Sequence, residues 1–485
     1  MGALAALALT ALPASAGLVS QGAVRMGADV LWSEGLRGQG QTVAVLDMGF
    51  GGLDRSIELG ELPGRQALVV QSFDATYGLD GRSEIGGLTQ HGVRMAELVH
   101  DLAPDARLLL ANYHTQAEFE QACEWAVANG AHIVSHSNSF LTPPFDGTGR
   151  SARAVDRVAA AGVLWINSVG NYAQRHWRGQ AAAAPAVIPI APRPGEYLML
   201  SLAWRDPAVR ASVAVERELP LLGWTAVQRS TPESAINAAT SRFLVDGGAW
   251  RLVVRQEAGP PADLRLFSQT VGFGGLAAAD ASVPTPADAA GALAVGAVRW
   301  TESALAPYSS RGPTDGGARK PDLVAPTYVN SNPEWPGTAG TSAATAHVAG
   351  AAALLRQMRQ GRGQPVDVES MRAALAHRAL DLGDPGVDDS FGGGQVRLDR
   401  SAPRLRLRLA PGARRLLRAR ASDRGTLREI RVSLDGQTLR TVRRPHDRVR
   451  LPTLAPGTHR VTVEAEDMAG NVAVKSRAFR GRGPA

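Results

Sequence analysis

The stretch QTVAVLDMGFGG, residues 41–52, runs from an apolar, β-branched segment into a carboxylate and a glycine-rich turn. A segment that is apolar at every position, rather than at alternate ones, is typical of a strand buried on both faces of a parallel sheet. Strand-like and helical segments then alternate as far as about Ile190, and GALAVGAV (residues 291–298) resumes the strand pattern. We therefore predict an α/β fold, a three-layer domain around a mainly parallel sheet.

Two other parts of the chain show a different pattern of apolar and polar residues. Residues 181–283 alternate apolar and polar positions between Pro and Gly, which predicts a β-rich inserted domain of sandwich or jelly-roll type. Residues 403–485 show the same alternation and an Asp435-Gly436 turn, which predicts a small Ig-like β-sandwich. The α/β domain would then comprise residues 17–180 and 284–400.

The first sixteen residues, MGALAALALTALPASA, combine a short apolar core with the small residues Ala14-Ser15-Ala16. This pattern indicates a signal peptide, so we expect a protein that is secreted or associated with the cell envelope. No Lys or Arg precedes Arg25, which departs from the usual signal, and no later stretch reaches about 18 uninterrupted apolar residues.

Charge is unevenly distributed. From residue 401 onward the chain has 20 Lys and Arg against 7 Asp and Glu, whereas the preceding part is mildly acidic. The basic C-terminal domain could contact the cell envelope or a protein, but scattered arginines on strands are more often a solvated face, and we expect no nucleic-acid partner. Cys123 stands alone on a helical pattern, which excludes an intramolecular disulfide and favours a small buried hydrophobe.

Four polar residues stand at the ends of predicted elements. Asp47 ends a strand, His91 opens a helix, Asn171 follows a strand, and Ser342 lies where PGTAGTS meets a helix of small residues. Taken singly, each has an ordinary structural explanation as a cap, turn or packing residue. Together they supply an orienting acid, a general base, an oxyanion donor and a nucleophile, which acyl-transfer chemistry requires.

Five segments carry a resemblance to a known family. They are VAVLDMGFGG, HGVRMAELVHDLAPDA, INSVGN, YSSRGPTDGGARKPDLVAP and GTSAATAHVAGAAALL, and in this order they resemble the blocks of the subtilisin-like serine peptidases (subtilases), here of a bacterial secreted type with a β-rich insert. The resemblance implies that Asp47 orients His91, that His91 is the general base, and that Ser342 is the nucleophile. It further implies that Asn171 and the Ser342 N–H bind the oxyanion.

The resemblance also implies a substrate-binding segment and leaves some features unmatched. Ser137, Asn138 and Ser139 take the place of the family's cleft-lining triplet, so backbone pairing with a peptide is retained while side-chain preference is undefined. Catalysis would require no cofactor and no catalytic metal. Structural calcium occurs in the family, but no ligand set can be matched residue by residue. The family's propeptide has no room between Gly17 and the first strand, so either it is absent or it precedes Met1, and we expect a monomer.

The sequence therefore predicts a secreted serine endopeptidase that acts on polypeptides. The alternative is a catalytically weak or inactive surface protein in which the same fold binds a partner. An α/β-hydrolase esterase fits less well, because G-x-S-x-G is missing around Ser342 and the order Asp, His, Ser differs from that fold.

Overall fold

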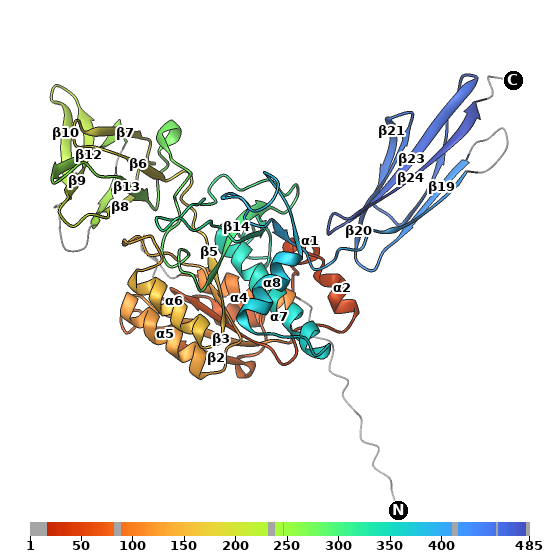
Figure 1. Cartoon of the computed structure of the whole chain (residues 1–485), viewed down its shortest axis with the longest axis horizontal. Helices are drawn as coiled ribbons and strands as arrows, with labels where there is room; N and C mark the ends of the chain where they lie inside the picture. Colours follow the sequence, from red (N-terminus) through yellow and green to blue (C-terminus); the bar gives the residue numbers. More distant parts are fainter. Residues whose placement is uncertain are drawn as a thin grey trace, which may run out of the picture.

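The structure is a computed structural model that describes residues 17–81, 89–230, 238–245, 247–409, 416–452 and 454–481. Figure 1 shows three parts: a central α/β body, a lobe of strands on one side, and an elongated pair of sheets at the C-terminal end on the other. The predicted signal peptide, residues 1–16, lies outside the described residues. No helix among the described residues is both long and apolar enough to cross a membrane.

The central body is built on a nine-stranded sheet. Its strand order is β16-β17-β15-β14-β5-β4-β1-β3-β2, and every pairing except β16 with β17 is parallel. The predicted α/β fold is confirmed. The strands are β1 (Thr42–Asp47), β2 (Leu68–Ser72), β3 (Arg107–Asn112), β4 (Ile133–His136), β5 (Leu164–Ser168), β14 (Ala292–Arg299), β15 (Leu323–Thr327), β16 (Ala379–Leu380) and β17 (Gln395–Val396).

Successive side chains of each central strand enter different cores. In β1, Val43 and Val45 pack with the helices α4 and α7, whereas Ala44 and Leu46 pack with α5 and α6 on the opposite face. Because both faces are covered, the strands are apolar throughout, as the opening stretch predicted. The helices of the body are α1 (Gln21–Arg25), α2 (Ala28–Ser33), α3 (Leu53–Glu58), α4 (His91–Leu102), α5 (Gln116–Ala128), α6 (Arg150–Ala160), α7 (Thr341–Gly361) and α8 (Val368–His377).

The inserted domain consists of two four-stranded sheets, ordered β10-β9-β12-β7 and β11-β8-β13-β6, around a shared apolar core. Strand β6 pairs with β13 inside this domain, so the insert includes His176 and begins before residue 181, the predicted boundary. Its strands are β6 (His176–Gly179), β7 (Ala186–Ile190), β8 (Tyr197–Trp204), β9 (Arg210–Leu219), β10 (Gly223–Arg229), β11 (Ala238–Leu244), β12 (Trp250–Ala258) and β13 (Leu264–Ser268).

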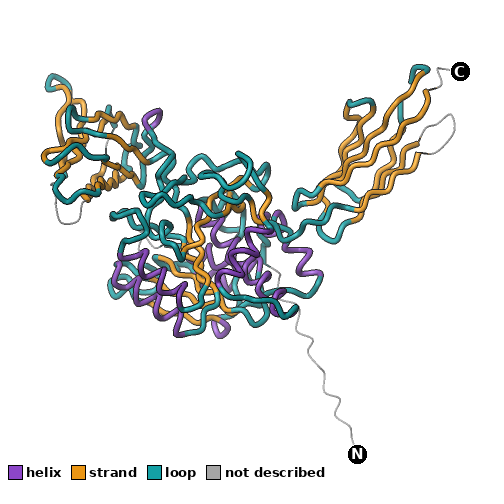
Figure 2. Tube along the Cα trace, viewed as in Figure 1, coloured by secondary structure: helices purple, strands orange, loops and turns teal. Residues whose placement is uncertain are grey.

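The C-terminal part pairs a three-stranded sheet, β18-β19-β22, with a four-stranded sheet, β21-β20-β23-β24 (Figure 2). Asp435 and Gly436 both have positive φ, as the tight turn between β20 and β21 requires. Residues of both sheets share one apolar core. The strands are β18 (Arg404–Leu409), β19 (Leu416–Ser422), β20 (Leu427–Leu434), β21 (Gln437–Val442), β22 (His446–Arg450), β23 (Gly457–Asp467) and β24 (Val472–Gly481).

Candidate active site

Asp47 and His91 are brought together at the carboxyl end of β1. Nδ1 of His91 lies 2.9 Å from Oδ1 and 2.8 Å from Oδ2 of Asp47, whose side chain is fully buried. A Cβ on Gly92 would lie 2.6 Å from the carbonyl oxygen of Gly49 and 3.0 Å from Cβ of Asp47. Glycine at position 92 therefore allows the first turn of α4 to approach the end of β1 closely enough for this contact.

Two opposing effects act on the pKa of His91. Burial is the largest and lowers the pKa, but the charge of Asp47 and its hydrogen bond together raise it by more, so the net pKa is above the usual 6.5. Asp47 Oδ1 also accepts a hydrogen bond from the N–H of Met48 at 2.8 Å, which fixes the orientation of the carboxyl group. A carboxylate at Nδ1 holds the ring so that Nε2 is the nitrogen able to accept a proton.

Ser342 is the second residue of α7, a helix of 21 residues that is almost entirely buried over its first four turns. Its hydroxyl donates to the carbonyl oxygen of Ser137 at 3.3 Å, which places the Oγ beside the carboxyl end of β4. Gly340, just before the helix, has φ of 103°, a conformation that favours glycine. The free N–H groups and positive dipole end of α7 stabilise negative charge beside this hydroxyl.

Asn171 is fixed to the start of the same helix. Its Oδ1 accepts hydrogen bonds from the N–H and the hydroxyl of Thr341, at 2.9 and 3.1 Å, and its Nδ2, the donor end of the amide, has no hydrogen-bond partner among the described residues. A Cβ on Gly340 would lie 3.5 Å from this Nδ2 and 3.6 Å from both N and Oγ of Ser342. The amide donor, the backbone N–H and the hydroxyl therefore lie around one small space that glycine leaves open.

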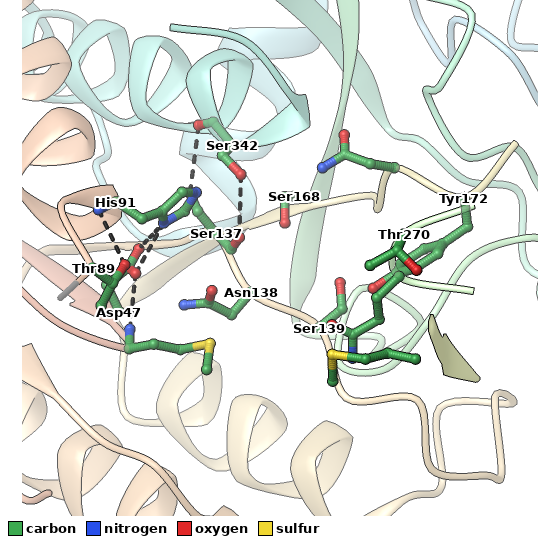
Figure 3. A pocket seen from close by; sticks show the side chains of 14 residues that line it. Asp47, Thr89, His91, Ser137, Asn138, Ser139, Ser168, Tyr172, Thr270 and Ser342 are labelled. Carbon is green, nitrogen blue, oxygen red and sulfur yellow. Dashed lines mark hydrogen bonds and ion pairs between the residues drawn. The ribbon is translucent and has the colours of Figure 1, made fainter. Parts of the chain in front are cut away.

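These groups line a single pocket of about 360 Å³. Ser137, Asn138 and Ser139 form its floor after β4, so all seven residues predicted from the sequence line it (Figure 3). The remaining lining residues were not predicted. They are Met48, Thr89, Ser168, Tyr172, Met199, Gln269 and Thr270. Met48, Ser168 and Tyr172 are near neighbours in sequence of predicted residues, which is a usable signal, whereas Met199, Gln269 and Thr270 come from the insert and carry no local signal.

A second histidine, His136, lies beneath the pocket at the end of β4. Its Nδ1 lies 2.6 Å from Oδ1 of Asn167 and its Nε2 lies 2.6 Å from the hydroxyl of Tyr113. Burial lowers its pKa to about 4, so the ring is neutral near pH 7. Both nitrogens are occupied, so His136 holds the strand end that leads into Ser137 rather than acting on a proton in the pocket.

One carboxylate cluster bears on the question of calcium. Asp399, Asp423 and Asp467 bring oxygens within 4.8 Å of one another where the α/β domain meets the C-terminal sheets. Both oxygens of Asp467 already accept hydrogen bonds from Asn471, and burial raises its pKa to about 6. Gly470 lies in the turn that follows Asp467, and the guanidinium groups of Arg25 and Arg397 lie close to it. Oxygens of this kind suit calcium, but nothing else about the cluster points to an ion.

Comparison with known proteins agrees with this geometry. Residues 273–394, which include Ser342, match the model of the Subtilase family, and no curated protein matches the sequence. The structure is similar to that of the CspB protease of Clostridium perfringens, with a TM-score of 0.54 and 16% identity over 78% of this chain and 97% of that one.

Two further solved structures are similar to the chain. One is a lanthipeptide protease, with a TM-score of 0.44 and 18% identity over 78% of this chain and 92% of that one. The other is the prenylagaramide maturation protease PagA, with a TM-score of 0.43 and 17% identity over 76% and 95%. Residues 273–394, around Ser342, match the Subtilase family model, and the similarity to the CspB protease shows that the chain has a subtilisin-like fold.

Proposed function

We propose that this protein is a secreted serine endopeptidase that cleaves polypeptides through an acyl-enzyme. The observation that carries the proposal is the contact of His91 Nδ1 with both carboxyl oxygens of Asp47, at 2.9 and 2.8 Å. Ser342 lines the same pocket, at the start of a buried helix. A pure binding surface has no physical need for a buried carboxylate aimed at one nitrogen of a half-exposed imidazole.

Each residue has a defined step in the proposed reaction. Oγ of Ser342 attacks the carbonyl carbon of the scissile bond while its proton passes to Nε2 of His91. His91 then donates this proton to the leaving amine as the C–N bond breaks, and water hydrolyses the ester that remains on Ser342. Asp47 stabilises the imidazolium, consistent with the raised pKa of His91.

The oxyanion formed during attack would be bound by Nδ2 of Asn171 and the N–H of Ser342. The open space beside Gly340, around which both donors lie, supports this role. Loss of one such donor typically lowers kcat by about 10² to 10³. In the structure the Ser342 hydroxyl donates to the carbonyl oxygen of Ser137, so its hydrogen bond must pass to Nε2 of His91 before attack.

Location and partners extend the proposal. We place the protein outside the cytoplasm because residues 1–16 have the pattern of a signal peptide, and we propose polypeptides as substrates from the family assignment. The basic C-terminal sheets would contribute a contact with the cell envelope or a protein, a role supported only by the charge of residues 401–485.

A fluorophosphonate probe tests the nucleophile directly. We expect the probe to label the wild-type protein and not Ser342→Ala, while Ser139→Ala, which changes another serine of the same pocket, stays labelled. Absence of labelling in the wild type, with cleavage of a casein substrate also absent, would favour the binding role that the sequence left open. Labelling that persists in Ser342→Ala would eliminate this serine as the nucleophile.

A further inference from the structure

The insert forms one end of the catalytic pocket. In Figure 3, Tyr172 and Thr270 lie at the opposite end from Asp47 and His91, with Ser139 and Ser168 between them. A substrate residue whose carbonyl is attacked by Ser342, the P1 residue, has its Cα bonded directly to that carbonyl. Because His91 must reach the leaving amine, the leaving group lies on the His91 side of Ser342, and the acyl side with its P1 residue lies on the other side, toward the insert.

Three insert residues line this end together with Tyr172. Met199 lies on β8 and is 9% exposed, and its carbonyl oxygen accepts a hydrogen bond from the N–H of Gln269 at 2.9 Å. Gln269 and Thr270 directly follow β13, and the Ser268 hydroxyl accepts the N–H of Thr270 at 3.2 Å. These bonds fix the loop after β13 against β8, so the three side chains form a defined wall.

The wall is also fixed to the α/β domain. Leu141 and Phe145 of that domain pack with Ala203 and Phe267 of the insert in one apolar cluster, and the rings of Phe145 and Phe267 are 5.3 Å apart. The hydroxyl of Ser201 donates to the carbonyl oxygen of Leu141 at 2.9 Å. The insert is therefore packed against the segment that follows Ser139, and these contacts set the position of the wall relative to Ser139.

The chemistry of this end is polar and uncharged. Among the residues that line the pocket, the acidic and basic side chains are those of Asp47 and His91, which contact each other at the far end. The insert end offers the ring of Tyr172, the carboxamide of Gln269 and the thioether of Met199, and the hydroxyls of Ser139 and Ser168 lie between this end and the nucleophile. The Thr270 hydroxyl is buried and has no hydrogen-bond partner among the described residues. No acidic or basic side chain of the described residues lines this end, so a charged P1 side chain would lose water here without contacting a counter-charge; the guanidinium of Arg175, which does not line the pocket, donates to the carbonyl oxygen of Gln269 at 2.8 Å.

We propose that the inserted domain determines side-chain specificity, and that its Met199, Gln269 and Thr270 select an uncharged polar P1 residue such as glutamine. This inference rests on the proposed peptidase function. Glutamine has a carboxamide that can both donate to and accept from the groups at this end, and an apolar stem that can pack on Met199. Glutamate has the same shape and differs in charge, so the two residues form a matched pair for measurement.

The test measures kcat/KM on peptides that are identical except for Gln, Glu or Lys at P1. We expect the wild type to prefer Gln over Glu and over Lys by at least about tenfold, the scale of one poorly matched buried group. Gln269→Lys places a cation in the pocket, and we expect it to raise the Glu-to-Gln ratio by about tenfold or more. Leu222→Lys adds the same charge at a position of the insert that is 73% exposed and outside the pocket, and should leave the ratio unchanged.

Labelling by the fluorophosphonate probe separates the two proposals. If Ser342 of the wild type is not labelled, the peptidase function fails. If it is labelled but Glu or Lys is accepted as well as Gln, or if Gln269→Lys and Leu222→Lys give the same ratio, the specificity inference is overturned and the function stands. Thr270→Lys provides a second variant with the same expected shift, should Gln269→Lys lose labelling.

Discussion

Asn171 has two separable roles in this structure, and two substitutions should divide them. Its Oδ1 accepts two hydrogen bonds from Thr341 at the start of α7, and its Nδ2 is the proposed oxyanion donor. Asn171→Ala removes both roles, whereas Asn171→Asp keeps an oxygen acceptor in place and removes the donor. The aspartate also adds a negative charge beside the helix N-terminus and beside the developing oxyanion.

The expected magnitudes differ between catalysis and stability. Loss of the donor should lower kcat by about 10² to 10³ in Asn171→Ala, or about 2.7 to 4 kcal/mol, with little change in KM. Asn171→Asp should lower kcat at least as much, because its charge repels the oxyanion. Loss of two hydrogen bonds should reduce the free energy of unfolding of Asn171→Ala by about 1 to 2 kcal/mol. Asn171→Asp should stay near the wild type, since a carboxylate at a helix N-terminus is stabilising.

The assay combines steady-state kinetics on a chromogenic peptide with urea unfolding of Ser342→Ala backgrounds, which prevents self-digestion. The two variants should rank in opposite orders for activity and stability, because Asn171→Asp should have the lower kcat and the higher free energy of unfolding. A large rise in KM at unchanged kcat would show that Asn171 binds the ground state and the transition state equally. Equal loss of stability in both variants would show that the bonds to Thr341 do not anchor the helix.

Three further predictions concern protonation. Asp47→Asn should lower kcat by about 10⁴ and move the acidic limb of the kcat/KM profile to lower pH, since Asp47 raises the pKa of His91; an unmoved limb would contradict that coupling. Burial raises the pKa of Glu97 to about 7, so the folded state binds this proton more tightly than the unfolded state, and the free energy of unfolding falls as pH rises from about 4.5 to about 7. Glu97→Gln should flatten this dependence of stability on pH in urea titrations. An unchanged dependence would show that Glu97 does not have a raised pKa. Burial lowers the pKa of His347 to about 4, so the free energy of unfolding should fall as pH drops from about 6.5 toward 4. His347→Gln should lose less stability over this range. An identical loss in both proteins would argue against a buried neutral His347.

The contacts of His347 illustrate how far local sequence can be interpreted. The run of small residues after Ser342 predicts a buried helix with His347 as a packing or hydrogen-bonding residue. In the structure, Nδ1 of His347 lies 2.7 Å from the carbonyl oxygen of Ala343, one turn earlier, and Nε2 lies 2.8 Å from the hydroxyl of Ser20. The first contact follows from helix geometry, whereas the partner 327 residues away could not be inferred from any pattern.

The sequence by itself determined the α/β fold class and the four polar residues at element ends, because strand burial and helix starts leave local patterns of apolar spacing and capping. Asp47, His91, Asn171 and Ser342 belong to separate elements, and the parallel sheet orders these elements so that their functional ends meet in one pocket.

Only the tertiary structure decided what else lines the pocket. The pairing of β6 with β13 put the start of the insert before residue 181, and the packing of Phe145 on Phe267 brought Met199, Gln269 and Thr270 to the substrate side. These contacts join segments that are distant in the chain, and they depend on side-chain shape across two domains. Such complementarity produces no periodic pattern in the sequence of either segment, so the wall formed by Met199, Gln269 and Thr270 could be identified only from the folded domains.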